Sequence, residues 1–490
     1  MAKHSLLKIN FIYSYGYHIL VLLLPLVTAP YVSRVLGADN LGIFSKTQAV
    51  AHYFLLFAML GVGKYGNRAI ARARDCPQEL SKVFWEIYAF QFIMACVCTL
   101  SYLICCCAFS WENALIYLIQ IGHVISAMAN INWCCMGLEK LRLIFVRNTI
   151  IKLLAAIAVF TLVKGRGDLW LYTLIVSLAT ILSDLAVWPF ILKRIFWVRP
   201  TWDGIRRHIK PNLLLFWSVI AVSIYNVMDR IMLGWFSTDA EVGYYTYAER
   251  VVRIPNTLML ALDGVVMPRM SNLFAKQGKE GRISYLMDTV MLFAMFMAGG
   301  MAFGMAGSAN VFAPWFFGKT FTRCGYFIVL LCPIIVVKGW AAALRTQFLI
   351  PSGRDKIYVF SITAGAFFNV IFNALLIPRW EGVGAIVGTI AAEVAVCVIQ
   401  FWCCRKDIPL WKYLFDGIIF SILGFVMYLV IIPISRLSFS ALPTLVLQVA
   451  SGSVIYLAMS CWVMIYVIKN PILINQALQF VGIKYRFARI

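Results

Sequence analysis

IYVFSITAGAFFNVIFNALLIP, residues Ile357 to Pro378, contains no charged side chain. A helix of about 20 apolar residues is long enough to cross the hydrocarbon core of a bilayer. A backbone inside lipid must satisfy its own hydrogen bonds, so this stretch is predicted to be a membrane-spanning helix. It does not alternate between apolar and polar residues, which argues against a strand of a membrane β-barrel.

Similar apolar runs recur along the whole 490-residue chain, in which 62% of residues are hydrophobic and only 13% are charged. A soluble protein of this length needs far more polar surface, so its length does not indicate two or three soluble domains. We therefore predict an all-α polytopic membrane protein with about fourteen transmembrane helices. The expected spans are 11–33, 43–62, 84–108, 114–136, 147–163, 170–192, 212–235, 243–267, 285–307, 324–348, 357–378, 383–403, 414–433 and 444–467.

The formal net charge of +22 would suggest nucleic-acid binding in a soluble protein. Here the lysines and arginines concentrate in alternate connecting segments, such as 64–82 and 193–210. Basic loops stay on the cytoplasmic side, so this alternation predicts an inner-membrane protein with both termini in the cytoplasm. No nucleic-acid partner is expected. The basic, amphipathic tail after Pro471 is expected to lie on anionic lipid.

The sequence gives no convincing motif for catalysis, metal binding or nucleotide-cofactor binding. The fourteen cysteines have no zinc-ligand spacing with histidines, so no metal is expected. Residues Gly61 to Gly66 match G-x-G-x-x-G, but they end a membrane helix, whereas a dinucleotide site needs them after a strand. The expected outer loops are short, the longest being 308–323. We therefore expect neither catalytic residues nor a cofactor, and the chain is not predicted to be an enzyme.

Two halves of the chain resemble each other. Arg34-Val-Leu-Gly37 and Gly42-Ile-Phe44 are echoed by Arg230-Ile-Met-Leu-Gly234 and Gly243-Tyr-Tyr245. Each half holds an even number of helices, so the copies share one orientation, which indicates parallel repeats with a site between them. The predicted division is a six-helix lobe over 1–200, a second six-helix lobe over 201–405, and two further helices with a cytoplasmic tail over 406–490.

Charged side chains inside a bilayer are costly and usually face a cavity or a partner. The in-span and span-end charges lean basic, which suits an anionic substrate such as a phosphate. The candidates for binding a pyrophosphate are Arg34, Lys46, Arg68, Arg230, Arg250, Arg253, Lys338 and Arg345. The acidic candidates for coupling to an ion are Asp229, Glu249 and Glu393.

Other interpretations of these charges remain open. Arg34 and Arg230 lie near an interface, where they also fit snorkelling to the headgroups. Arg68 also fits a positive-inside marker. Asp229 beside Arg230, and Glu249 one turn before Arg253, also fit local ion pairs. Glu393 lies in a stretch of small residues that also fits helix packing.

The residues resemble bacterial polysaccharide (O-antigen and capsule) flippases of the multidrug/oligosaccharidyl-lipid/polysaccharide exporter superfamily. The resemblance rests on motifs spread over residues 5–405. They are Pro25-Leu-Val-Thr-Ala-Pro30-Tyr-Val-Ser-Arg34-Val-Leu-Gly37, Gly42-Ile-Phe44, Gly61-Val-Gly-Lys-Tyr-Gly66-Asn-Arg68, Asp229-Arg-Ile-Met-Leu-Gly234, Glu241-Val-Gly243-Tyr-Tyr, Pro268-Arg-Met-Ser271, Ile377-Pro378, Gly382-Val-Gly384-Ala and Ala392-Glu393.

The resemblance implies two lobes that open alternately to each side of the membrane. The implied substrate is an undecaprenyl-pyrophosphate-linked oligosaccharide, moved to the outer leaflet for O-antigen, capsule or exopolysaccharide synthesis. It also implies basic cavity residues, carried here by Arg34, Lys46, Arg68 and Arg250. Coupling to H⁺ or Na⁺ is a further expectation, and a polymerase and glycosyltransferases of the same pathway are possible partners.

Three alternative functions differ in the residues they need. A multidrug or organic-cation antiporter of the same fold would line its path with acidic groups, and here the basic groups outnumber them. A membrane glycosyltransferase or polymerase would need catalytic carboxylates or a sizeable water-facing loop. A lipid II flippase would share the basic cavity, and the sequence does not separate it from the first interpretation.

Overall fold

The computed structural model describes residues 2–108, 113–260, 263–276, 280–437, 439–470, 473–475 and 479. Every regular element in those residues is helical, which confirms the all-α prediction. The chain forms two compact units, residues 1–243 and 244–490, and each is treated by itself below. The tail predicted to lie on lipid falls almost entirely outside the described residues.

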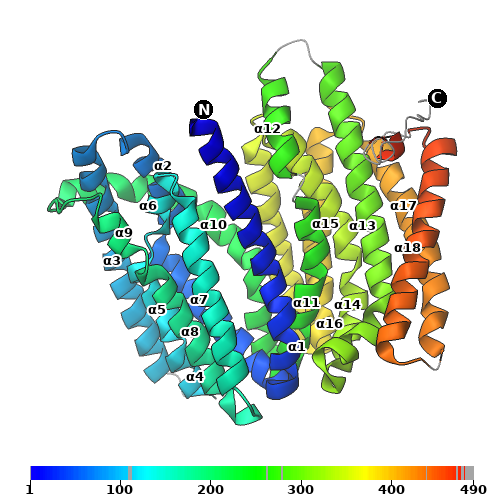
Figure 1. The fold of residues 1–490 in the computed structure, drawn as a ribbon, viewed down its shortest axis with the longest axis horizontal. Helices are drawn as coiled ribbons and strands as arrows, with labels where there is room; N and C mark the ends of the chain where they lie inside the picture. Colours follow the sequence, from blue (N-terminus) through cyan, green and yellow to red (C-terminus); the bar gives the residue numbers. More distant parts are fainter. Residues whose placement is uncertain are drawn as a thin grey trace. The chain divides into compact units, whose positions relative to one another are not determined.

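The first unit is a bundle of long and short helices (Figure 1). Its long helix α1 packs against α3, α5, α7 and α10, and α8 packs against α5 and α7. The helices are α1 (Ala2–Met59), α2 (Val62–Ala73), α3 (Pro77–Ala108), α4 (Ala114–Ile119), α5 (Ile121–Ala129), α6 (Asn132–Gly137), α7 (Leu141–Leu162), α8 (Leu169–Leu185), α9 (Trp188–Leu192) and α10 (Trp202–Phe236).

Helix α1 joins two of the predicted spans across a kink. Gly37 has φ 81° and ψ 173°, a conformation that side chains with a Cβ rarely adopt. The glycine therefore allows the chain to change direction between spans 11–33 and 43–62. The first half of the echoed motif, Arg34 to Phe44, lies around this kink.

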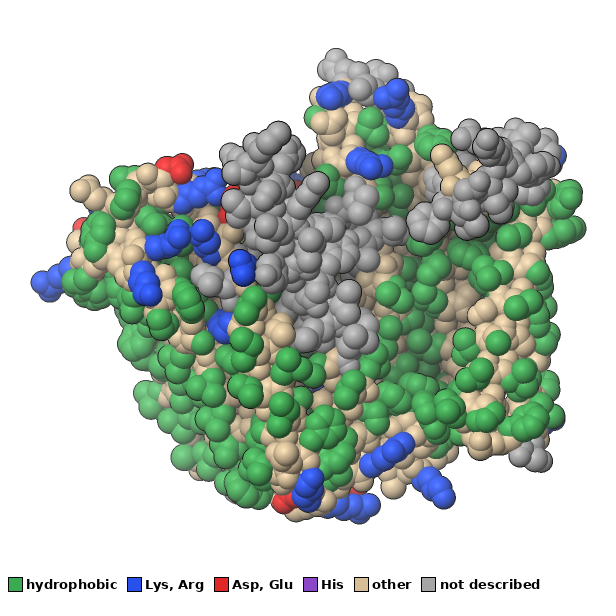
Figure 2. Space-filling model, viewed as in Figure 1, with side chains coloured by type: hydrophobic (Ala, Val, Ile, Leu, Met, Phe, Trp, Pro, Cys, Tyr) green, Lys and Arg blue, Asp and Glu red, His purple; other side chains and the backbone are tan. Residues whose placement is uncertain are grey.

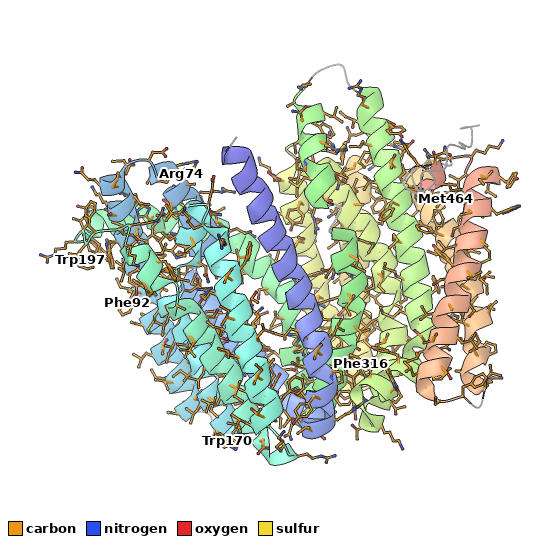
Figure 3. The ribbon with its side chains drawn as sticks, viewed as in Figure 1. Arg74, Phe92, Trp170, Trp197, Phe316 and Met464 are labelled. Atoms are coloured by element: carbon orange, nitrogen blue, oxygen red, sulfur yellow. The ribbon has the colours of Figure 1, made fainter. Side chains whose placement is uncertain are left out.

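The outer surface of the first unit suits a lipid environment. Trp170 and Trp197 lie at opposite ends of the unit, with Phe92 between them, and all three are exposed (Figure 3). On the flank seen in Figure 2, hydrophobic side chains cover the middle, and lysines and arginines gather near the α2 end. Tryptophans at both ends of an apolar belt are typical of membrane–water interfaces.

The second unit contains α12 (Asp263–Phe274), α13 (Glu280–Phe317), α14 (Thr322–Leu331), α15 (Pro333–Leu344), a π-turn over Arg345–Leu349, α16 (Asp355–Cys404), α17 (Leu410–Ile431) and α18 (Ala441–Tyr466). Helix α11 (Asp239–Leu260) begins in the first unit and continues into the second. Helix α13 packs against α14, α15, α17 and α18, and α15 packs against α16. The core between them includes Met295, Trp340, Phe420 and Tyr456.

Length and hydropathy identify ten helices in the described residues that are able to cross a membrane, or eleven when the bent pair 319–331 and 333–349 is one span. All fourteen predicted spans lie on helices of the structure. The two numbers differ because α1 and α16 each hold two predicted spans, joined at Gly37 and at Glu381 (φ 51°). The described part of the predicted span 243–267 lies on α11 and α12, neither of which is both long and apolar enough to be counted.

The six-plus-six-plus-two division into lobes stays a prediction. The compact units meet at residues 243 and 244, within α11, so α10 belongs to the first unit by its contacts. The division at residue 243 reflects which helices contact one another, whereas the predicted division at residue 200 reflects the repeated sequence motifs.

Candidate functional site

Lys46, a predicted pyrophosphate ligand, forms an ion pair with Asp239 at the start of α11. The Lys46 Nζ and Asp239 Oδ1 atoms are 2.5 Å apart, and only 13% of the lysine side chain is exposed. An ion pair with so little solvent has limited screening, so each partner depends on the other for its charge.

The echoed glycine motifs meet around this ion pair. A Cβ on Gly42 would run into the backbone carbonyl of Asp239, and one on Gly243 would run into the carbonyl of Ala38. A Cβ on Gly234 would strike the Lys46 side chain. Glycines therefore let α1 approach α10 and α11 closely, and the Lys46–Asp239 pair lies at this junction.

Asp229 and Arg230 lie on α10 where it packs against α1. Asp229 is buried and Arg230 is partly buried. Arg230 interacts electrostatically with His52 of α1, and Asp229 with Tyr53. The Tyr53 hydroxyl also donates to the Ser223 carbonyl at 3.4 Å. Lys46 of α1 and Asp229 and Arg230 of α10 thus lie along one polar seam, the line of contact between these two helices in the first unit.

Lys338 and Glu393 form an ion pair in the second unit. The Lys338 Nζ and Glu393 Oε1 atoms are 2.5 Å apart, and the glutamate side chain is 3% exposed against 31% for the lysine. The sequence placed these residues in different roles, one binding substrate and one coupling to an ion. The ion pair therefore places a predicted substrate-binding residue and a predicted ion-coupling residue in direct contact, between α15 and α16.

The other predicted residues of the second unit have local partners. Arg253 Nη2 pairs with Glu249 Oε1 at 2.5 Å one turn earlier on α11, which matches the local-pair interpretation. Arg250 lies over the Tyr247 ring at 4.8 Å from its centroid. Arg345, in the π-turn, lies over the Tyr358 ring at 5.5 Å.

Arg34 and Arg68 are exposed on α1 and α2 of the first unit. Arg34 follows the apolar part of α1, and Arg68 lies mid-way along the short amphipathic α2. Their roles as phosphate ligands, and the roles of the other nine predicted residues, stay predictions.

A pocket of about 540 Å³ in the first unit was not predicted. It lies between α1, α7 and α8. Its lining is mostly apolar, with polar groups from Asn148, Lys152, Ser183 and Asp184. Ser183 Oγ donates to Asn148 Oδ1 at 2.6 Å. Lys152 and Asp184 are charged residues within predicted spans, so the same rule that selected Lys46 would have selected them.

A network of amides surrounds Asp184 at one end of this pocket. Asn132 Nδ2 donates to Asp184 Oδ1 at 2.9 Å, and Asn130 Nδ2 donates to Asp184 Oδ2 at 3.3 Å. Arg147 Nη2 donates to Asn132 Oδ1 at 3.2 Å. The network ties the loop before α6 to α7 and α8.

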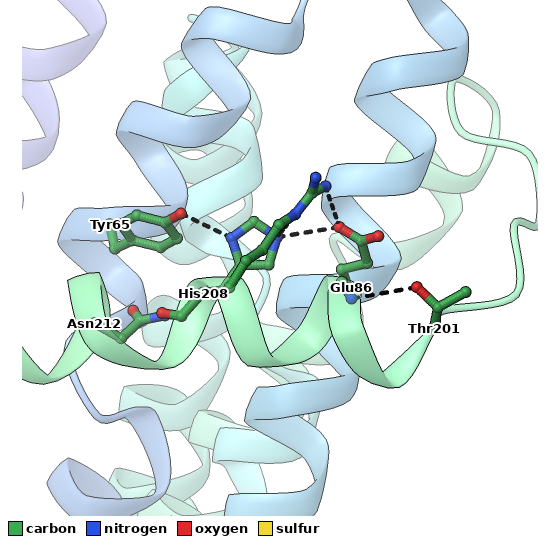
Figure 4. Close-up of polar contacts among 7 residues, drawn as sticks. Tyr65, Glu86, Thr201, His208 and Asn212 are labelled. Carbon is green, nitrogen blue, oxygen red and sulfur yellow. Dashed lines mark hydrogen bonds and ion pairs between the residues drawn. The ribbon is translucent and has the colours of Figure 1, made fainter.

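A second unpredicted cluster surrounds the buried Glu86 of α3 (Figure 4). Glu86 Oε2 accepts from Arg207 Nη2 at 2.5 Å and lies 3.1 Å from His208 Nε2. The Tyr65 hydroxyl and His208 Nδ1 share a hydrogen bond of 2.7 Å. Burial lowers the pKa of His208, although Glu86 opposes this shift. The cluster fastens the start of α10 to α2 and α3.

Comparisons with known proteins address the family and the fold. The model of the family described as "Polysaccharide biosynthesis protein" matches residues 7–274, which is more than half of the chain. The "Putative O-antigen transporter" of Escherichia coli (strain K12) is 21% identical over 390 residues, covering 79% of this chain and 93% of that protein.

Two solved structures share the fold. The lipid II flippase MurJ in an inward closed conformation aligns with TM-score 0.77 at 14% identity, over 93% of this chain and 99% of that one. An inward-facing multidrug resistance MATE transporter of the MOP superfamily aligns with TM-score 0.56 at 13% identity, over 79% of this chain and 95% of that one. With the family match over residues 7–274, the chain belongs to the polysaccharide biosynthesis protein family.

Proposed function

We propose that the protein is a flippase that moves undecaprenyl-pyrophosphate-linked oligosaccharides from the cytoplasmic to the outer leaflet by alternating access. Support comes from the family and from the O-antigen transporter that aligns over 93% of its length. One structural observation carries the proposal: two lysines within apolar helices are held by acidic partners, in the ion pairs Lys46–Asp239 and Lys338–Glu393. Such charges inside a membrane are a functional signal, because each costs free energy to bury.

In this proposal the chain sits in the bacterial inner membrane with both termini in the cytoplasm. The pyrophosphate travels along the basic residues, the sugars travel in water, and the polyprenyl chain stays in lipid. The protein acts by binding and conformational change, without a catalytic residue or a resident cofactor. A polymerase and glycosyltransferases of the same pathway are its proposed partners.

Ion coupling is part of the proposal. Glu393 is buried against Lys338, and Asp229 is buried in the seam with α1. Protonation or Na⁺ binding would break the Lys338–Glu393 ion pair or remove the buried charge of Asp229. A change of that kind can shift the balance between two conformations of a transporter. Glu249 is the third candidate, held by Arg253.

Deletion of the gene in its own host tests the proposed function. Loss of surface polysaccharide, with lipid-linked oligosaccharides accumulating on the cytoplasmic face, supports it, provided that the wild-type gene restores export. Normal export after deletion contradicts it. The fold is shared with a lipid II flippase and a multidrug transporter, so lipid II movement and efflux of a cationic dye are measured in the same strains.

A further inference from the structure

The first turns of α10 lead from the polar segment 193–201 into the membrane. The Thr201 side chain caps the helix by accepting from the Gly204 N–H at 3.2 Å. The apolar part of this helix begins at Leu213, a few residues after Arg206, Arg207 and Lys210. Residues 202–217 therefore lie where a span meets the headgroup layer.

One face of these turns is fixed to the rest of the first unit by the Glu86 cluster (Figure 4). Arg207 and His208 both contact the Glu86 carboxylate, and a Cβ on Gly204 would collide with it. Further along the same face, a Cβ on Gly61 would press against the Asn212 carbonyl. These contacts set the rotation of α10 about its own axis.

The opposite face of α10 carries a basic group followed by an apolar group. Arg206, Ile209, Lys210, Leu213, Leu214 and Trp217 line a pocket of about 590 Å³. Spacings of four, seven, eight and eleven residues from Arg206 place Lys210, Leu213, Leu214 and Trp217 on one side of a helix. Leu214 is 70% exposed and Trp217 61% exposed. Within the described residues, neither Arg206 nor Lys210 has an ion pair or a side-chain hydrogen bond.

We propose that this face of α10 is the loading site for the pyrophosphate of the polyprenyl-linked substrate. This inference rests on the proposed function. It adds a position on the substrate's path that is separate from the charged residues within the membrane spans. The Arg206 guanidinium suits bidentate binding of phosphate oxygens, and Lys210 one turn later adds a second positive charge. Leu213, Leu214 and Trp217 then contact the first isoprene units, at the depth where tryptophan favours the interface.

Charge complementarity selects this occupant over an ordinary phospholipid. A pyrophosphate diester carries more negative charge than the single phosphodiester of phosphatidylglycerol, and two adjacent cations match it better. The Glu86 cluster is the positioning element, because it keeps Arg206 and Lys210 turned away from the packed face. Since α10 begins on the cytoplasmic side in the proposed orientation, the site lies on the side where the substrate is made.

The test uses the full chain in nanodiscs of phosphatidylcholine, with undecaprenyl pyrophosphate as the probe. Two basic residues near a membrane surface contribute enough attraction that Arg206→Ala with Lys210→Ala should weaken binding about tenfold or more. Arg206→Lys with Lys210→Arg should retain most of it. The matched control, Arg72→Ala with Lys82→Ala, removes one exposed arginine and one exposed lysine elsewhere in the first unit and should bind as the wild type does.

Two results overturn the loading site. One is wild-type affinity for undecaprenyl pyrophosphate in the Arg206→Ala, Lys210→Ala variant. The other is an equal loss of phosphatidylglycerol binding, which would make the face a general anionic-lipid surface. If the double variant does not fold, the wild-type chain is photo-crosslinked with a diazirine derivative of undecaprenyl pyrophosphate. Adducts within residues 206–217 support the site, and adducts confined to other segments overturn it.

Export assays in cells separate this inference from the proposed function. A wild-type chain that restores surface polysaccharide, together with a double variant that binds the probe normally, overturns the loading site alone. A wild-type chain that neither restores export nor binds the probe overturns the proposed function, and the loading site with it.

Discussion

Lys338 of α15 and Glu393 of α16 form an ion pair within the second unit, with 2.5 Å between Nζ and Oε1. The glutamate is almost fully buried and the lysine is about two-thirds buried. Replacing one partner of a buried ion pair by an uncharged residue leaves the other charge buried without compensation. Replacing both partners by uncharged residues of similar size leaves no buried charge.

The first prediction follows from this asymmetry. Lys338→Met should lower the free energy of unfolding by about 3 kcal/mol, because Glu393 would stay buried without its cation. The double variant Lys338→Met, Glu393→Gln should recover most of that loss. Thermal unfolding of the purified variants in detergent measures both effects. A single variant as stable as the wild type would show that the ion pair is not formed.

The second prediction concerns the close approach of α1 and α11. Gly42→Ala places a methyl group against the Asp239 carbonyl, so the helices must separate. Overpacking of this kind should cost about 1–3 kcal/mol and disturb the Lys46–Asp239 pair. Gly63→Ala is the matched control, because a Cβ at Gly63 meets no atom within 4 Å. Equal melting temperatures for the two variants would contradict this packing.

The spans were predictable from the sequence because an apolar run of membrane length has no other stable backbone structure in lipid. The Glu249–Arg253 pair was predictable as well, since residues four apart meet on one helix. The Lys46–Asp239 pair joins residues far apart in the chain, and no local spacing reveals it. The glycines around it were visible as an echoed motif, but the motif indicated a repeat and did not reveal that its two copies touch.

The third prediction compares a protected ion pair with an exposed one. Lys46→Ala should reduce polysaccharide export about tenfold or more at normal protein level, since a charge-assisted contact in a poorly solvated position is lost. Arg323→Ala breaks the half-exposed Arg323–Glu381 pair and should change stability by about 0–1 kcal/mol. Export is measured by surface staining of cells that lack the chromosomal gene. Full export with Lys46→Ala would remove this residue from the path.

The fourth prediction concerns acidification near the start of α10. Burial lowers the pKa of His208 from its usual value of 6.5, so the unfolded chain binds a proton there more readily than the folded chain. Stability from neutral His208 is therefore complete above pH 6.5 and is lost as pH falls from 6.5 through the lower folded pKa. The charged neighbours Glu86 and Arg207 and the hydroxyl of Tyr65 surround the ring.

Melting temperatures at pH 7.5 and pH 5 measure this effect. The wild type should lose more stability between the two values than His208→Gln, which keeps a polar side chain without a titrating ring. An identical loss in both proteins would mean that the dependence arises at other groups.

Movement of the lipid-linked oligosaccharide in reconstituted liposomes tests the central claim most directly. A fluorescent undecaprenyl-pyrophosphate-linked oligosaccharide is placed in the inner leaflet, and a membrane-impermeant quencher outside reports its arrival in the outer leaflet. We predict movement that requires the protein, is faster with an imposed H⁺ or Na⁺ gradient, and is lost with Lys46→Ala. Movement no faster than in protein-free liposomes, or movement of lipid II with none of the oligosaccharide, would contradict the account.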